Sequence, residues 1–267
     1  MSCVAVYCDG RFDGAALAMN LALAAITGSE RHVLLWEFAE ERSVAQPLGA
    51  AMRQYTQARR LFSREADMPD SIRSTRHRRL DILPAQATIQ HLFERPTRAD
   101  GREPLSSHLE QWHRAYDLVV VDCPANAADL SDEILELADL VVAPFLLDSR
   151  AEQARHDLAQ HVARCGGREL LPLLAAPDWD AINGDLPEAL ERWPRVPQME
   201  LQVRDDGAMP PSAGSRGDDA LPAFALIWTT IEQKLLELDS DREADQRFID
   251  DKSGRSAKAG DPALFQR

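Results

Sequence analysis

The stretch CVAVYCDGRFDGAALAMNLALAAI, residues 3–26, sets the architecture of this chain because its pattern changes twice along its length. Residues 3–8 are a short apolar run with β-branched valines, which is typical of a buried strand. Gly10 and Gly14 mark a loop, and the alanine-rich residues 15–26 predict a buried helix. Because a second apolar run, HVLLW, follows at 32–36, the stretch predicts the opening strand–helix–strand unit of a parallel sheet.

Strands and helices continue to alternate after this unit. Strands are predicted at 80–83, 118–121, 140–143 and 170–175, and helices at 105–116, 129–137, 151–165 and 221–238. Residues 43–79 are predicted to be helical with loops, and residues 203–219, rich in Gly, Pro and Ser, to be a loop. The alternation predicts an α/β fold with a doubly wound, mostly parallel sheet flanked by helices. We expect one domain over residues 1–238, followed by a polar, mobile C-terminal tail over 239–267.

The composition fits a single α/β domain. With 267 residues, 45% of them hydrophobic, the chain can bury one sizeable core. No apolar run approaches the roughly 20 residues that span a bilayer, and the N-terminus begins a strand without a basic leader. We therefore expect a cytoplasmic protein without membrane contact. The net charge of -14 argues against attraction of the whole surface to nucleic acid or to an anionic membrane.

Neither the cysteines nor the histidines show the spacing of a metal site. The four cysteines lack the paired C-x-x-C pattern of a zinc site and the density of a disulfide scaffold, so reduced thiols are expected: Cys3, Cys8, Cys123 and Cys165. The histidines form no H-E-x-x-H pattern, and no G-x-S-x-G nucleophile motif occurs. We therefore predict no bound metal.

Five segments, taken in order, resemble the ParA/MinD family of P-loop ATPases. Residues 18–22 (AMNLA) resemble the family's A-x-N-L-A helix motif. The other four resemble its strand motifs, including the Walker B strand: 33–37 (VLLWE), 80–85 (LDILPA), 116–124 (YDLVVVDCP) and 138–144 (ADLVVAP). The resemblance covers residues 1–238, and the order of the motifs is more specific than any single one. It implies a P-loop fold in which a glycine-rich loop holds ATP and Mg²⁺.

The loop itself departs from the family pattern, K-G-G-x-G-K-T-T. The register set by the helix motif places Asp9 at the first, signature lysine and places Arg11 and Asp13 at loop glycines. Gly14 stands at the lysine that binds phosphate, and Ala15 stands at the threonine that binds magnesium. The resemblance therefore implies a nucleotide site that has lost its lysines.

No nearby lysine can replace the missing ones, since the first lysine in the chain is Lys234. P-loops surround phosphates with backbone N–H groups, a helix N-terminus and a lysine. One carboxylate about 4 Å from a phosphate oxygen would weaken binding by about 4 kcal/mol, or a few thousandfold. We therefore predict no catalytic residue and no bound cofactor, with ATP and Mg²⁺ expected only if the chain is an active ATPase. The vestigial nucleotide site consists of Gly10, Gly14, Ala15 and Asp122.

The acidic residues leave alternatives open. Asp122 is either an inherited magnesium ligand or a residue that now caps the next helix or pairs with an arginine, and we favour the second role. The acidic residues near the strand ends either converge on a hard cation or face solvent and pair with Arg11, which we favour: Asp9, Asp13, Glu37 and Asp122. Cys8 and Cys123 end strands that are neighbours in this family, and we expect two buried thiols there rather than a redox pair.

One basic segment opposes the acidic charge of the whole chain. Between residues 51 and 80, arginines outnumber acidic residues: Arg53, Arg59, Arg60, Arg64, Arg73, Arg76, Arg78 and Arg79. This arginine segment is interpreted as a patch that binds an acidic protein partner or DNA phosphates, or as a solvated, salt-bridged helical face. Because the net charge is negative, we favour a protein partner and expect weak DNA binding or none.

Three functions remain open. The favoured one is a ParA-like partition or positioning protein that acts as a scaffold without hydrolysing ATP, and places a cargo through contacts with a protein partner or cargo adaptor. The second is an active ParA-type ATPase with nucleotide-driven dimerisation and non-specific DNA binding. The third is an accessory subunit of an envelope, secretion or exopolysaccharide synthesis complex. Because Asp9 cannot hold a partner's phosphates as the signature lysine does, any homodimer is expected to form without nucleotide.

Overall fold

The computed structural model describes residues 1–38, 43–45, 48–49, 71–89, 104–124, 128–176, 179, 182, 186–196 and 217–258. Within these residues, a 7-stranded sheet has the order β3-β4-β2-β5-β1-β6-β7. The strands are β1 (Ser2–Tyr7), β2 (Val33–Glu37), β3 (Arg73–Ser74), β4 (Leu80–Leu83), β5 (Leu118–Cys123), β6 (Leu140–Leu146) and β7 (Leu170–Ala175). All neighbouring strands are parallel except β3 and β4. The predicted fold, a mostly parallel α/β sheet, is confirmed.

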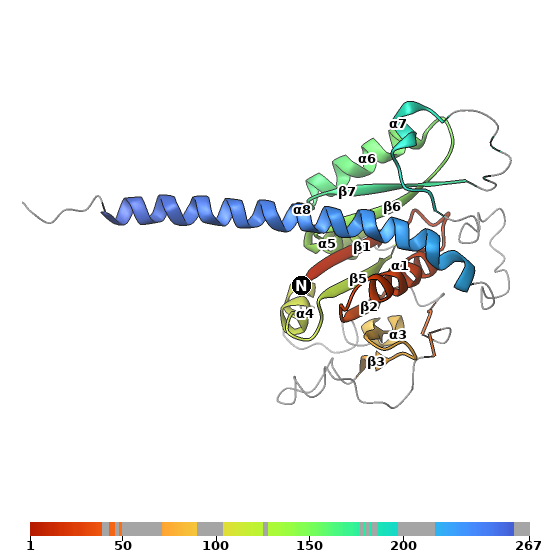
Figure 1. Cartoon of the computed structure of the whole chain (residues 1–267), viewed down its shortest axis with the longest axis horizontal. Coiled ribbons are helices and arrows are strands. Elements are labelled where there is room, and N and C mark those ends of the chain that lie inside the picture. The colour runs from red at the N-terminus through yellow and green to blue at the C-terminus, as the bar shows by residue number, and fades with distance from the viewer. Residues whose placement is uncertain are drawn as a thin grey trace, which may run out of the picture.

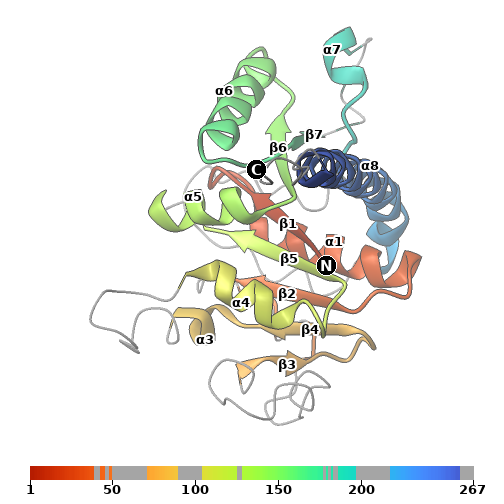
Figure 2. The ribbon, with the colours of Figure 1, turned by 90° about the vertical axis from the view of Figure 1, so that its left-hand side faces the viewer.

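Helices cover both faces of this sheet (Figures 1 and 2). One face carries α1 (Gly14–Gly28) and α8 (Gly217–Lys258). The other face carries α4 (Leu105–Trp112), α5 (Ala128–Leu137) and α6 (Ala151–Arg164). The remaining described helices, α3 (Ala85–Ile89) and α7 (Glu188–Glu191), are short. Along β1, Val4 and Val6 face the α1 side while Cys3 and Ala5 face the α5 side, so both sides of the strand are buried and apolar.

The C-terminal helix α8 is longer than predicted. It begins at Gly217 and ends at Lys258, so the predicted helix end at residue 238 is wrong and the predicted domain boundary lies inside a helix. The first half of α8 packs on the domain through buried apolar side chains at helical spacing: Phe224, Ile227, Trp228, Ile231 and Leu235. The polar composition after residue 238 led to the prediction of a tail, but a helix with few apolar residues can continue from a packed one.

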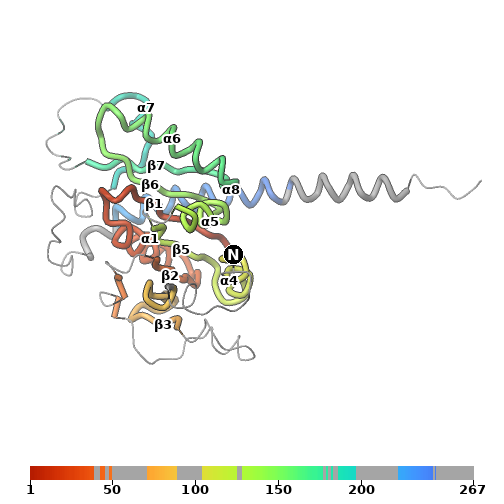
Figure 3. The backbone as a smooth tube through the Cα atoms, turned by 180° about the vertical axis from the view of Figure 1, so that it is seen from behind, coloured from red at the N-terminus to blue at the C-terminus, as the bar shows by residue number. Residues whose placement is uncertain are grey.

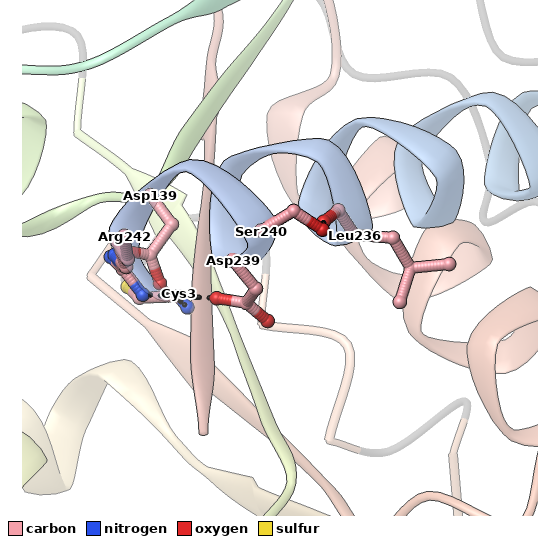
Figure 4. Close-up of polar contacts among 6 residues, drawn as sticks. All are labelled: Cys3, Asp139, Leu236, Asp239, Ser240 and Arg242. Atoms are coloured by element: carbon pink, nitrogen blue, oxygen red, sulfur yellow. Dashed lines mark hydrogen bonds and ion pairs between the residues drawn. The ribbon is translucent and has the colours of Figure 1, made fainter. Parts of the chain in front are cut away.

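A buried carboxylate fixes α8 to the sheet (Figure 4). Arg242 of α8 forms an ion pair with Asp139, which precedes β6 and is 8% exposed. The other oxygen of Asp139 accepts a hydrogen bond of 2.8 Å from the backbone N–H of Cys3 in β1. Arg242 also lies 3.2 Å from Asp239, three residues earlier in the helix. Because Arg242 follows residue 238, the segment predicted as a tail contributes a contact to the domain.

The arginine segment differs from its prediction where it is described. Residues 72–79 do not form a helix: β3 pairs with β4 as an antiparallel hairpin, and Arg79 in the turn has a φ of 75°. Most of the stretch from 43 to 70 lies outside the described residues, as do residues 203–216 of the loop predicted over 203–219. The last three residues of that predicted loop, 217–219, belong to α8, so the prediction is wrong there. Within the described ranges, no helix is both long enough and apolar enough to cross a membrane.

Candidate functional site

The predicted nucleotide site lies where β1 and β5 end side by side. Val6 is the register partner of Asp122, and Tyr7 is the partner of Cys123. Residues 8–13 lead from β1 into α1, whose first residue is Gly14. Ligand sites in open parallel sheets occur at this carboxyl edge, so the position is the one expected for a P-loop. The structure thus brings Gly10, Gly14, Ala15 and Asp122 to one corner of the sheet, as the motif order predicts.

The side chain of Asp122 lies beside Gly14. A Cβ atom added to Gly14 would lie 2.8 Å from Oδ1 of Asp122 and 3.4 Å from the sulfur of Cys8. Asp122 is 3% exposed. The buried carboxylate therefore occupies the space into which a side chain at position 14 would extend. A lysine there, as in the family pattern, requires the loop or Asp122 to move.

Two loop carboxylates bind the loop's own backbone donors. Asp9 accepts a hydrogen bond of 3.1 Å from the backbone N–H of Arg11 and also pairs with the Arg11 guanidinium at 2.5 Å. Asp13 is the N-cap of α1 and accepts a hydrogen bond of 3.1 Å from the backbone N–H of Ala16. The predicted pairing of an acidic loop residue with Arg11 is confirmed. An N-terminal helix N–H and a loop N–H, donors of the kind that bind phosphate in P-loops, are thus already satisfied.

The loop is also fixed by packing. Phe12 is 4% exposed and lies in the hydrophobic core together with Ala15. The guanidinium carbon of Arg11 lies 5.8 Å from the centre of the Phe12 ring. Gly10 has a φ of +85°, a left-handed conformation that favours glycine. Opening the loop around a phosphate would break the Asp9 and Asp13 hydrogen bonds, and displacing Phe12 would expose apolar surface.

The carboxylates do not gather into a cation site. Within the described residues, no three of the four predicted groups bring oxygens within 4.8 Å of one another: Asp9, Asp13, Glu37 and Asp122. Cys8 and Cys123 are free and buried. Burial raises the pKa of Cys8, and the nearby Asp122, Asp9 and Asp13 add to the effect. Burial raises the pKa of Cys123 to about 12. Both thiols are therefore protonated near neutral pH and unreactive.

Glu37 closes the end of β2 instead of binding a cation. It is fully buried, and its carboxylate accepts hydrogen bonds of 2.7 Å from the Ser43 hydroxyl and 2.6 Å from the backbone N–H of Val44. Burial raises the pKa of Glu37, although hydrogen bonds from Val44, Ser43 and Ala85 favour its charged form. The sequence motif located this acidic residue correctly, but its role is to hold the following segment.

The raised pKa of Glu37 predicts a pH effect on stability. The folded state binds a proton more tightly than the unfolded state, so the free energy of unfolding should fall as pH rises from the ordinary glutamate value of 4.5 through the raised folded value. Glu37→Gln should remove this dependence, and denaturant unfolding at several pH values measures it. The exposed substitution Glu30→Gln is the matched control. A difference between wild type and Glu37→Gln that does not change with pH would contradict the prediction.

The described part of the arginine segment is only partly exposed. Arg76 and Arg78 are exposed, whereas Arg73 and Arg79 are half-buried. Arg79 donates a hydrogen bond of 3.5 Å to the backbone carbonyl of Ile26, near the C-terminus of α1, where a cation is favourable. Arg79 is therefore a structural residue. The other four arginines lie outside the described residues: Arg53, Arg59, Arg60 and Arg64.

One polar cluster was missed by sequence reasoning. Asp132 of α5 meets His161 of α6 and Cys165, which follows α6. The four-residue spacing of His161 and Cys165 is a sequence signal, since side chains at that spacing share a helix face. The contribution of Asp132 requires the packing of α5 on α6, which no local pattern reveals.

Comparisons with known proteins agree with the observed fold. A family model described as an AAA domain matches residues 14–168, more than half of the chain. No curated protein matches. The cell division ATPase MinD of Pyrococcus furiosus is 16% identical with a TM-score of 0.58, over 87% of this chain and 98% of that chain. A plasmid partition protein from Borrelia burgdorferi is 13% identical with a TM-score of 0.56, over 88% of this chain and 100% of that chain.

A third solved structure carries a nucleotide. The septum site-determining protein MinD of Pyrococcus horikoshii, complexed with Mg-ADP, is 14% identical with a TM-score of 0.54, over 84% of this chain and 94% of that chain. At these identities the structural likeness shows a shared fold, and the family match adds the evolutionary relation. The chain therefore belongs to the AAA-domain family, and it shares its fold with the MinD and plasmid partition structures.

Proposed function

We propose that the protein is a ParA-like partition or positioning protein that acts as a scaffold, without binding or hydrolysing ATP. The observation that carries this proposal is that Asp9 and Asp13 accept hydrogen bonds from one loop N–H, that of Arg11, and one N–H of the first turn of α1, that of Ala16. A bound phosphate would have to displace both carboxylates and would then lie among their charges. No lysine precedes Lys234 to offset them.

The ion pair of Asp9 with Arg11 weakens the repulsion that Asp9 would exert on a bound phosphate. Arg11 neutralises part of the Asp9 charge, so Coulomb repulsion from Asp9 alone is weaker than for an unpaired carboxylate. The hydrogen bonds of Asp9 and Asp13 with the backbone N–H groups of Arg11 and Ala16 are then the stronger obstacle. They act by geometry and do not depend on salt, whereas a surface charge effect is screened.

If the protein is a scaffold, it should not hydrolyse ATP, and its oligomeric state should not depend on nucleotide. Phosphate release from ATP with Mg²⁺ should equal the buffer background, and light scattering should give the same molar mass with and without Mg²⁺–ATP. Any homodimer should already be present before ATP is added. Magnesium-dependent turnover that Asp122→Ala abolishes, or a monomer that dimerises only with ATP, would favour the active ATPase instead.

The exposed arginines Arg76 and Arg78 are the members of the arginine segment to test for binding. We expect weak or no binding to random duplex DNA near physiological salt, measured by gel shift, because the whole chain carries a charge of -14. If DNA binds, changing both residues to glutamate should weaken binding to all sequences alike and lower the salt slope by about 1 per lost phosphate contact. The matched control changes the exposed Arg114 and Arg168 to glutamate. Submicromolar DNA binding that depends on Arg76 and Arg78 alone would contradict our ranking of a protein partner above DNA.

A further inference from the structure

The Asp132, His161 and Cys165 side chains form a compact cluster between α5 and α6, two helices that lie side by side (Figures 2 and 3). Oδ1 of Asp132 lies 2.9 Å from Nε2 of His161, and the sulfur of Cys165 lies 3.9 Å from the same Nε2. The three ligand atoms all lie within 4.8 Å of one another. Three different ligand types therefore converge on one point of the surface.

The geometry does not suit a nucleophilic triad. In such a triad the base uses one ring nitrogen toward the nucleophile and the other toward the carboxylate. Here the Asp132 oxygen and the Cys165 sulfur approach the same nitrogen of His161. Ligands of one metal ion, in contrast, all point toward a common centre. Metal–ligand bonds of about 2.0–2.3 Å in a tetrahedron separate the ligand atoms by roughly 3.3–3.8 Å, which is close to the spacing of this cluster.

The surroundings add negative charge and bring Glu136 near the cluster. The cluster lines an open cavity of about 690 Å³ that also contains Glu136, one turn after Asp132 on α5. A Cβ atom added to Gly166 would lie 3.7 Å from Cγ of Glu136, so this glutamate reaches the residue next to Cys165. Arg164 is the basic residue among those that line the cavity, against four acidic ones. The electrostatic field of these acidic residues therefore favours the binding of a cation at the cluster.

We propose that Asp132, His161 and Cys165 bind a zinc ion, with Glu136 or water as the fourth ligand. A set of thiolate, imidazole and carboxylate in tetrahedral spacing is typical of Zn²⁺, whereas Mg²⁺ and Ca²⁺ prefer oxygen ligands alone. Cys165 is also accessible, unlike the three buried cysteines: Cys3, Cys8 and Cys123. The ion would tie α5 to the end of α6. The proposal is independent of the scaffold role, since the cluster shares no residue with the loop.

The test is a titration of metal-free, tag-free full-length protein with Zn²⁺ in competition with a chromophoric chelator. We expect one equivalent to bind, and we expect Cys165→Ser and His161→Ala each to weaken binding at least about 100-fold, because losing even an outer-shell partner costs about 10- to 100-fold. His156→Ala changes an exposed histidine of the same helix and should leave binding unchanged. Circular dichroism of each variant confirms that it is folded.

Cobalt provides a readout that reports on the ligands directly. Co²⁺ should give the intense visible bands of a tetrahedral site and a thiolate charge-transfer band, and Cys165→Ser should lose the charge-transfer band. Zn²⁺ should protect Cys165 from alkylation in the wild type. The proposal is overturned if zinc does not bind stoichiometrically, or if binding persists in both Cys165→Ser and His161→Ala.

Discussion

Lysine at position 14, the residue that the family pattern has there, is expected to destabilise this protein by about 1–3 kcal/mol, the range for overpacked sites, and to leave ATP unbound. The destabilisation follows from the 2.8 Å separation between an added Cβ and Oδ1 of Asp122. ATP should still fail to bind because Asp9 and Asp13 continue to occupy the loop and helix donors. Denaturant unfolding and an ATP titration of Gly14→Lys measure the two effects.

A double-mutant cycle separates the steric conflict between position 14 and Asp122 from the other effects of the lysine. In an Asp122→Ala background the obstructing carboxylate is absent, so Gly14→Lys should cost much less than in the wild type. Equal costs in the two backgrounds would show that Asp122 does not obstruct position 14. Restored ATP binding in the single variant would show that the loop carboxylates yield readily to phosphate.

Asp139→Ala is expected to lower the free energy of unfolding and to loosen the end of α8. Removing the carboxylate leaves the buried N–H of Cys3 without its acceptor, which costs about 1–3 kcal/mol. It also breaks the ion pair with Arg242, whose side chain is 36% exposed, so this part adds only about 0–1 kcal/mol. Denaturant unfolding gives the total, and hydrogen exchange of residues 236–242 reports the release of α8.

The matched variants are Arg242→Ala and Asp239→Ala. Arg242→Ala should cost less than Asp139→Ala, because the bond from Cys3 to Asp139 remains. Asp239→Ala, which changes an exposed partner of Arg242, should have little effect on stability. If Arg242→Ala were as damaging as Asp139→Ala, the ion pair rather than the backbone hydrogen bond would account for the stability that Asp139 contributes.

The hydrophobic pattern of the sequence was sufficient to predict the sheet. Its strands are buried on both faces and therefore stand out as continuous apolar runs. The apolar runs beginning at residues 3, 32 and 118 became β1, β2 and β5, and the glycines of the first loop located the start of α1. The end of α8 was not predictable in the same way. A contact of α8 beyond residue 238 joins Arg242 to Asp139, residues 103 apart in sequence, and no local periodicity encodes such a pair.

The position of the candidate site was predictable from the sequence, but the conformation of its loop was not. Motif order placed Asp9, Asp13, Gly14 and Asp122 correctly at the carboxyl edge of the sheet. Asp13 could also have been read as an N-cap, because aspartate directly before an alanine-rich helix is a common cap. The path of the loop was beyond sequence reasoning: the burial of Phe12 and the pairing of Asp9 with Arg11 depend on how six residues fold against the core.

The central claim is that this loop does not hold nucleotide, and calorimetric titration of Mg²⁺–ATP into the wild-type protein tests it most directly. We expect no saturable heat, or an affinity in the millimolar range or weaker, with and without magnesium. A micromolar affinity that requires magnesium and disappears in Asp122→Ala would contradict the account and identify the protein as a nucleotide-binding member of its family.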